Sequence, residues 1–205
     1  MFSIYDIKPT FQALLRPLVN QIHIKGFTAN QVTVFTFIFS ILYALLLAIF
    51  IESSWLLILF PIVLFLRMAL NAIDGLLAKE HHQKTPLGAI LNELTDMAAD
   101  AALYLPFALY PGINHFLIIA IVILALLSEA AGLSGLLVGG SRRYDGPMGK
   151  SDRAFIFSLL AIWLALFDFS TWLNWFLLII CFLILLTIVN RVRQILQEVE
   201  ATHGT

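Results

Sequence analysis

The sequence has few cysteines and few charged residues. Cys181 is the only cysteine among 205 residues, so the chain can form neither an internal disulfide nor a cysteine-based metal site. We interpret it as a small apolar packing residue in the last hydrophobic stretch. Only 12% of the residues are charged and 60% are hydrophobic, whereas about a quarter are charged in typical soluble domains. This composition excludes a soluble domain and indicates an integral membrane protein.

Six apolar stretches predict six transmembrane helices. A helix needs about 20 residues to cross a hydrocarbon core of about 30 Å. The stretches lie at residues 31–51, 55–79, 86–110, 114–139, 152–168 and 171–190, and the fifth is the shortest. We therefore expect an all-α integral membrane protein with a single domain over residues 1–205. Its six-helix core is predicted to span residues 28–193.

An amphipathic pattern precedes the first of these stretches. Apolar residues recur at helical spacing between residues 3 and 25, with lysine, arginine and glutamine between them. They predict an N-terminal helix that lies at the membrane interface and that Pro17 can interrupt. Thr28 is spaced from Gln31 as in a capping box. Thr33 is polar and close to the cytoplasmic face, as is its neighbour Asn30, so both could face a headgroup site.

Lysine and arginine lie on one side of the predicted spans. Basic residues accumulate in short cytoplasmic loops of membrane proteins. Here they occur before the first span, in every second loop and after the last span, whereas the turns around residues 52, 111–114 and 168–171 contain none. This asymmetry predicts that both termini are cytoplasmic. The net charge of −1 indicates no particular partner, and we expect no nucleic acid to bind.

Carboxylates within two predicted spans are the main anomaly of the chain. Asp74 lies in the second span, and Glu93, Asp96 and Asp100 lie in the third. A charge near the middle of a bilayer costs about 2.5 to 3.5 kcal/mol, so such residues usually line a cavity or bind cations. The region from Asn71 to Asp100 is therefore the candidate functional site.

Helical geometry places the polar residues of these spans on two faces. Asn71 and Asp74 share a face of the second span, and Asn92, Asp96 and Asp100 follow at four-residue intervals on the third. Facing each other, they would form an oxygen-rich pocket that suits Mg²⁺ or Mn²⁺. Neither face carries a histidine or cysteine that would suggest zinc.

Three small residues, Gly75, Ala78 and Gly88, accompany these polar groups. They leave space in which a flat base or a pyrophosphate could approach the helix backbone. Tight helix packing explains each of them equally well when it is taken alone. Only the joint spacing of small and polar residues favours a binding site.

The joint spacing resembles the signature of the CDP-alcohol phosphatidyltransferase family. That signature reads DxxDGxxAR, eight or nine residues, then GxxxDxxxD. This sequence reads NAIDGLLAK from Asn71 to Lys79, eight residues, then GAILNELTD from Gly88 to Asp96. The longer segments RMALNAIDG and LNELTDMAADAALYLPF look like a bacterial inner-membrane branch of the family. The resemblance covers essentially the whole chain.

The resemblance implies an enzyme of phospholipid biosynthesis. It would transfer a phosphatidyl or related phospho-alcohol group from a CDP-linked lipid, with CDP-diacylglycerol expected, to the hydroxyl of an alcohol acceptor, and release CMP. It also implies Mg²⁺ or Mn²⁺ as cofactor, a possible homodimer, and an active site at the cytoplasmic face of a bacterial inner membrane. Residue by residue, the implied metal ligands are Asn71, Asp74, Asn92 and Asp96, with Asp100 as an additional candidate. Asp96 would be the catalytic base, and the CDP contacts would be Asp74, Gly75, Ala78, Lys79 and Gly88.

Three positions depart from the family pattern. Asn71 and Asn92 replace aspartates, and a neutral amide oxygen should hold cations more weakly than a carboxylate. Glu93 or Asp100 could supply the missing charge. Lys79 replaces an arginine, so it keeps the positive charge but loses the bidentate fork. The site is therefore either rearranged, or it binds one cation well and a second one poorly.

Charged residues outside the signature allow two interpretations each. The basic loop from Gly140 to Arg153 is expected from topology alone, but Lys150 and Arg153 could contact a phosphate of the acceptor or donor. Glu129 lies beside a stripe of small residues in the fourth span that predicts close helix packing. Arg67 is its candidate partner, unless Glu129 is protonated.

Two other functions remain open at this stage. Buried carboxylates also occur along ion pathways, so the chain could be a divalent-cation transporter. Transporter sites usually lie near the bilayer midplane between repeated halves, whereas these acids lie at helix ends and the chain has no repeat. The two asparagines also fit a family member whose catalysis is impaired.

Overall fold

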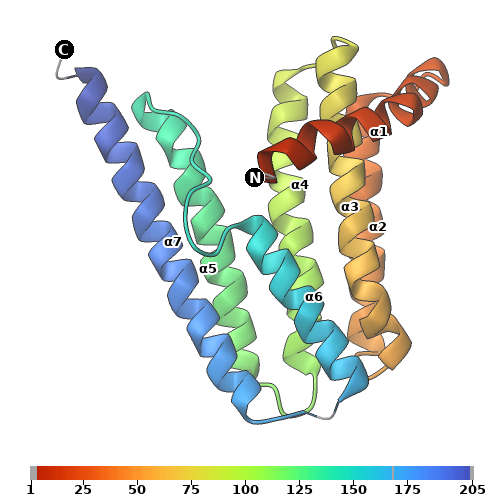
Figure 1. Cartoon of the computed structure of the whole chain (residues 1–205), viewed down its shortest axis with the longest axis vertical. Helices are drawn as coiled ribbons and strands as arrows, with labels where there is room; N and C mark the ends of the chain where they lie inside the picture. The colour runs from red at the N-terminus through yellow and green to blue at the C-terminus, as the bar shows by residue number, and fades with distance from the viewer. Residues whose placement is uncertain (1–3, 168, 204–205) are drawn as a thin grey trace. The chain divides into compact units, whose positions relative to one another are not determined.

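The computed structural model describes the backbone of residues 4–167 and 169–203, and side chains from residue 11 onward within those ranges up to residue 202. The chain is 83% helical, and no strand occurs in the described residues. Figure 1 shows the helices, whose bounds are α1 (Ile4–Ile24), α2 (Ala29–Ile49), α3 (Ser54–Glu80), α4 (Pro86–Tyr104), α5 (His115–Ser134), α6 (Lys150–Leu166) and α7 (Trp172–His203). Two short 3₁₀ helices follow α4 and α5, namely η1 (Leu105–Leu109) and η2 (Gly135–Val138).

The chain forms two compact units. The first contains residues 1–43 and 62–99, and the second contains residues 44–61 and 100–205. The first unit therefore comprises α1, most of α2 and α3, and the first part of α4. The second comprises the α2–α3 turn and everything from the end of α4 to α7.

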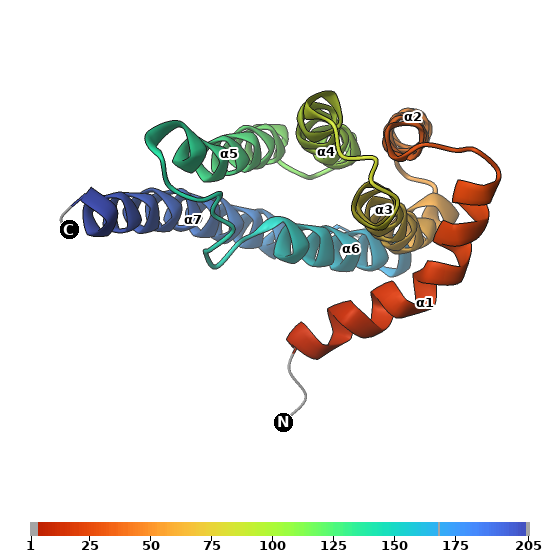
Figure 2. The ribbon, with the colours of Figure 1, turned by 90° about the horizontal axis from the view of Figure 1, so that it is seen from above.

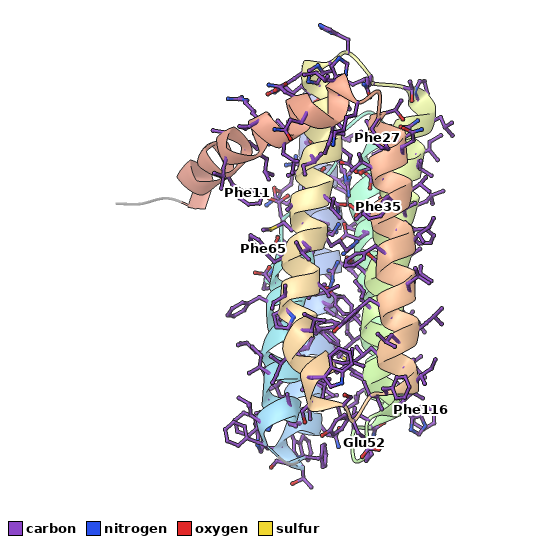
Figure 3. All side chains as sticks on the ribbon, turned by 90° about the vertical axis from the view of Figure 1, so that its right-hand side faces the viewer. Phe11, Phe27, Phe35, Glu52, Phe65 and Phe116 are labelled. Carbon is purple, nitrogen blue, oxygen red and sulfur yellow. The ribbon has the colours of Figure 1, made fainter. Side chains whose placement is uncertain are left out.

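The first unit is built around an apolar cluster at the ends of three helices. Val19 of α1, Val32 of α2 and Leu77 of α3 are buried together there. Figure 3 shows α1 lying across the ends of α2 and α3, and the rings of Phe11 and Phe65 meet edge to face at 6.0 Å. The helix α1 runs without a break through Pro17, so the expected interruption does not occur.

In the second unit, α5 and α7 run side by side (Figures 1 and 2). Their core continues into a group of aromatic rings. Phe107 of η1 lies 5.1 Å from Phe60 and 5.3 Å from Phe157 of α6, measured between ring centroids. Tyr104 stacks on Phe157 at 4.2 Å. These rings attach α6 to the end of α4, where Pro106 ends the regular α-helix.

Four of the six predicted spans meet the length and hydropathy expected of a membrane-crossing helix. They are Ala29–Ile49, Ser54–Glu80, His115–Val138 and Trp172–Thr202. The other two stretches also form helices, but α6 has only 17 residues and α4 carries three acids that lower its hydropathy. The acids that mark the candidate site are thus the reason why α4 resembles a typical span least.

The capping box that the sequence predicts at the start of α2 is present in the structure. Thr28 and Gln31 form the capping box of α2, with Thr28 N donating to Gln31 Oε1 at 2.9 Å and Gln31 N to Thr28 Oγ1 at 3.3 Å.

The last helix, α7, extends 13 residues beyond the predicted end at residue 190. Ile195 is buried on this extension, and Glu198 pairs with Arg143 at 2.8 Å. Contacts with the basic loop therefore hold the extension in place.

Candidate active site

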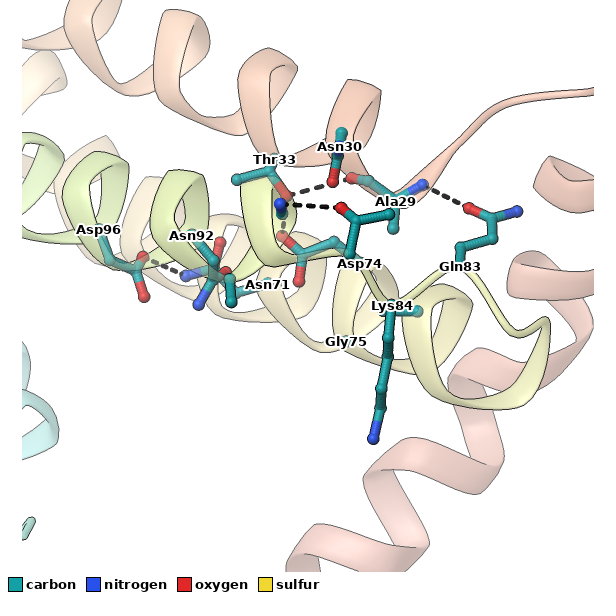
Figure 4. A pocket seen from close by; sticks show the side chains of 14 residues that line it. Ala29, Asn30, Thr33, Asn71, Asp74, Gly75, Gln83, Lys84, Asn92 and Asp96 are labelled. Atoms are coloured by element: carbon teal, nitrogen blue, oxygen red, sulfur yellow. Dashed lines mark hydrogen bonds between the residues drawn. The ribbon is translucent and has the colours of Figure 1, made fainter. Parts of the chain in front are cut away.

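A cavity of about 430 Å³ opens within the first unit (Figure 4). The start of α2, the last third of α3, the turn after α3 and the start of α4 form its walls. The lining residues are Ala29, Asn30, Thr33, Asn71, Asp74, Gly75, Ala78, Gln83, Lys84, Thr85, Gly88, Ala89, Asn92 and Asp96. Asn71 and Asp74 of one predicted polar face therefore line one cavity together with Asn92 and Asp96 of the other.

Most of the residues predicted for the metal and CDP sites line this cavity, but three of the candidates on α3 and α4 lie elsewhere. Lys79 is exposed at the end of α3, Glu93 is half-buried on α4, and Asp100 is buried one turn beyond Asp96. None of the three is among the lining residues. Asn30 and Thr33, for which the sequence suggests a headgroup site, do line the cavity.

Asp74 is the buried carboxylate of the cavity wall. Its side chain comes from α3, and the residue is 5% exposed. Thr33 of α2 donates its hydroxyl hydrogen to Asp74 Oδ2 at 2.8 Å, and the same hydroxyl lies 3.1 Å from the carbonyl oxygen of Ala29. This contact orients the carboxylate and joins the two helices.

Asp96 is oriented by two donors from α3. Arg67 Nη2 donates to Asp96 Oδ1 and to the backbone oxygen of Asp96, each at 3.0 Å. Asn71 Nδ2 donates to the same Oδ1 at 2.7 Å. The Arg67 side chain is only 5% exposed, so this ion pair is largely desolvated and should be strongly directional. Arg67 lies one helical turn before Asn71, a spacing that could have placed it on the polar face.

The predicted pairing of Arg67 with Glu129 is corrected by these contacts. In the second unit, Glu129 of α5 instead accepts from Arg153 Nη2 of α6 at 2.8 Å. Arg191 of α7 lies 3.4 Å from the same carboxylate, and Arg142 of the basic loop lies 3.6 Å from it. Three arginines thus balance one buried acid.

Arg153 is fully buried in this cluster and also donates to Ser128 Oγ at 3.2 Å and to the Met148 carbonyl oxygen at 3.1 Å. Its guanidinium is therefore engaged by the protein itself. Lys150, the other candidate phosphate contact, is half-buried in the first turn of α6. Lys150 and Arg153, which the sequence analysis proposed together as phosphate contacts, therefore differ in burial.

The small-residue stripe of α5 packs against the same basic loop. A Cβ atom on Gly132 or Gly135 would collide with the carbonyl oxygen of Arg143 or Ser141, respectively. The sequence predicts close helix packing for this stripe; at these two positions the nearest neighbour is the backbone of the basic loop, followed by Arg191 and Ile195 of α7.

The two glycines of the cavity have different roles. A Cβ atom on Gly75 would meet nothing within 4 Å, so this glycine leaves open space beside Asp74. A Cβ atom on Gly88 would lie 2.6 Å from Asn30 Oδ1. Gly88 therefore allows the start of α4 to approach α2, whereas Gly75 enlarges the cavity.

The oxygen atoms around the cavity fit a hard divalent cation. Asp74 and Asp96 supply carboxylates, and Asn71 and Asn92 supply amide oxygens. Within the described part of the chain, no three His, Cys, Asp or Glu side chains come together as a metal-binding group. The fit therefore depends on the two amides, and the acidic charge is lower than in the family signature.

Three lining residues of the α3–α4 turn escaped the sequence analysis. Gln83 Oε1 accepts from the backbone N–H of Ala29 at 2.7 Å, and Thr85 Oγ1 accepts from that of Gly88 at 2.9 Å. Lys84 stands between them with an exposed side chain. All three lie in the eight-residue spacer between the two halves of the motif. Their position in this spacer was the one sequence feature that could have indicated them.

The fold and this site define a membrane phosphatidyltransferase. Residues 27–186 match the family model described as CDP-alcohol phosphatidyltransferase. The chain belongs to the CDP-alcohol phosphatidyltransferase family.

One relative and two crystal structures extend this assignment. The chain is 45% identical to "Inner membrane protein YnbA" of Escherichia coli (strain K12) over 195 residues, which cover 95% of this chain and 96% of the relative. Together with the apolar helices, this similarity supports an inner membrane protein. The fold matches phosphatidylinositol phosphate synthase (PgsA1) of Mycobacterium tuberculosis in complex with manganese and citrate, with a TM-score of 0.73, 18% identity and 87% of each chain covered. It also matches the same synthase with CDP-DAG bound, with a TM-score of 0.69, 19% identity, and 90% of this chain and 92% of the other covered.

Proposed function

We propose that the protein transfers a phosphatidyl group from CDP-diacylglycerol to the hydroxyl of an alcohol, with release of CMP, in phospholipid biosynthesis. The observation that carries the proposal is the single cavity in which the oriented carboxylates Asp74 and Asp96 lie beside the open space at Gly75. Family membership supplies the reaction type. The synthase crystallised with CDP-DAG supports the lipid substrate through its fold.

Asp96 is the proposed general base. In the reaction, the acceptor oxygen forms a bond to the phosphorus that carries diacylglycerol, and the bond from that phosphorus to the bridging oxygen of CMP breaks. Asp96 takes the hydroxyl proton. Because Arg67 and Asn71 both hold Oδ1, the carboxylate keeps one orientation toward the cavity. Fixed orientation is what a base needs to reach a hydroxyl within about 3 Å.

The proposed ligands of Mg²⁺ or Mn²⁺ are Asp74 and Asp96 with the amide oxygens of Asn71 and Asn92. A cation held there would neutralise charge on the diphosphate and on the departing CMP. With two carboxylates in place of four, we propose that one cation is bound well. Asp100, one turn beyond Asp96, stays a predicted additional ligand.

The proposed membrane arrangement is six spans, α2 to α7, with α1 at the cytoplasmic interface. Both termini and the cavity would face the cytoplasm, because the basic residues cluster on that side. Asp96, one of the three acids of α4, lines the cavity, which accounts for its place within a span. A homodimer stays a prediction.

The test uses purified protein in detergent with CDP-diacylglycerol, Mg²⁺ or Mn²⁺, and a panel of alcohols. CMP release should depend on the cation and on one class of acceptor. Asp74→Asn and Asp96→Asn should each lower the rate by at least about a hundredfold, as expected for loss of a general base or of charge at the reacting phosphate. Asp145→Asn, the same change on an exposed residue of the second unit, is the matched control. Undiminished CMP release by both cavity variants would refute the assignment.

Impaired catalysis is the second candidate, and the amides at positions 71 and 92 favour it. Such a protein would bind CMP with the cation but would release none from CDP-diacylglycerol with any acceptor. Restoring the acids with Asn71→Asp and Asn92→Asp would then create activity. If the native chain is an enzyme, it should be active without these changes.

A further inference from the structure

We infer that Lys84 binds the diphosphate of the CDP-linked lipid and supplies positive charge that a single divalent cation leaves unbalanced. The inference rests on the proposed function and names a residue outside the family signature. The signature resemblance assigns the nearby positive charge to Lys79, but Lys79 does not line the cavity. Among the described lining residues, Lys84 is the single lysine or arginine.

The backbone on both sides of Lys84 is anchored. Gln83 N donates to the Ala78 carbonyl oxygen at 3.1 Å, and the Gln83 side chain is bound to the start of α2. Thr85 caps the start of α4 through Gly88 N. Lys84 itself is exposed, and Figure 4 shows its side chain extended. The loop thus holds the backbone in place while the ammonium group stays free to move toward a ligand.

The charges of the cavity require such a group. Each phosphate of a CDP-linked lipid carries a negative charge, and the cavity wall adds Asp74 and Asp96. Arg67 pairs with Asp96 at 3.0 Å. Because Asn71 and Asn92 replace two acids of the signature, the oxygen set attracts less cationic charge than the signature would. A lysine at the cavity wall restores part of this missing positive charge, because its ammonium group is a mobile point charge.

The geometry leaves room for the phosphates near Lys84. Gly75 opens the wall on α3, and the first turn of α4 contributes Gly88 and Ala89 to the lining. Space and the ammonium group therefore favour the same ligand, a nucleoside diphosphate or monophosphate.

The test compares CMP with cytidine, which lacks the phosphate, in binding titrations with purified protein and Mn²⁺. Lys84→Met should weaken CMP binding about tenfold, equal to roughly 1.4 kcal/mol, and should leave cytidine binding unchanged. Lys84→Arg should retain most of the CMP affinity. Lys79→Met should cost less than Lys84→Met, and Lys25→Met provides the same change on an exposed lysine away from the cavity. Since Lys84 is exposed, its variants should unfold at the temperature of the native protein.

The outcomes separate the two proposals. If the native chain binds CMP and Lys84→Met binds it equally well, or if Lys79→Met causes the larger loss, the role of Lys84 is refuted and the proposed function stands. If Lys84→Met weakens cytidine as much as CMP, Lys84 shapes the pocket and does not bind phosphate. If the native chain binds no CMP with either cation, the proposed function fails, and the inference fails with it.

Discussion

Asp96 is held in the cavity by two side chains of α3. Two donors on α3 meet its Oδ1 atom, and one of them, Arg67, also bonds the backbone oxygen of the same residue. Asn71 donates a hydrogen bond to Asp96, which an ionised aspartate could not do. In the proposed site its amide oxygen would also be a ligand of the cation. An aspartate at position 71 would repel Asp96 unless a cation lay between them.

Gly75→Ala tests whether the space at this glycine serves the substrate. The new methyl group would point into the cavity without a clash, and alanine favours a helix over glycine by about 0.5 to 1 kcal/mol. We expect the unfolding temperature to rise slightly, whereas KM for CDP-diacylglycerol increases severalfold. Gly88→Ala is the comparison, because its methyl group would press against Asn30 and should lower stability. An unchanged KM in Gly75→Ala would show that the substrate does not use this space.

The residues on helical faces were predictable, and those in the turn were not. Asn71, Asp74 and Asp96 reach one cavity because a regular helix repeats its faces every three to four residues. Lys84 lies in a turn whose path depends on hydrogen bonds to α2 and α4, which no local period encodes. The partner of Glu129 was mispredicted for a similar reason, since the three arginines around it come from separate segments.

Among the helices, α5, α6 and α7 are joined by the buried charges around Glu129. Arg153 and Arg191 are at most 1% exposed, and Arg191 also donates through Nη1 to the Ser128 carbonyl oxygen. Buried charges of this kind cost much desolvation energy and contribute to stability only while they remain paired.

Glu129→Ala should destabilise the second unit strongly, because it leaves three arginines without their shared acid. Breaking a buried ion pair typically costs about 3 to 5 kcal/mol. The unfolding temperature in detergent should therefore fall clearly, whereas Glu52→Ala, which removes an exposed glutamate, should leave it nearly unchanged. Equal unfolding temperatures for the two variants would mean that the cluster does not support the fold.

The apolar stretches predicted where the helices lie, but only four of the described helices meet the length and hydropathy of a membrane span. Every apolar stretch became helical, with ends within two residues of the prediction once η1 and η2 are counted with α4 and α5, except at the end of α7. The helix α4 is not among the candidate spans, because Glu93, Asp96 and Asp100 lower its hydropathy. The extension of α7 could not be predicted from apolar content, because Glu198 holds it through Arg143 and Ser141.

For the molecule as a whole, membrane topology decides where substrates reach the cavity. If all six helices cross, residue 111 faces the periplasm and residue 145 the cytoplasm. If only the four most apolar helices cross, the two positions exchange sides. In a Cys181→Ala background, Pro111→Cys should react with an impermeant maleimide in intact cells, and Asp145→Cys should react only after lysis. The reverse pattern would contradict the six-span arrangement.

The central claim is that the cavity of Asp74 and Asp96 carries out cation-dependent phosphatidyl transfer. The most direct measurement is CMP release from CDP-diacylglycerol by the purified native chain, with and without Mn²⁺, across uncharged and phosphorylated alcohols. We predict CMP formation that requires the cation and one acceptor class, and that is lost in Asp96→Asn. The absence of CMP with every acceptor and cation, or release that persists in Asp96→Asn, would contradict the account.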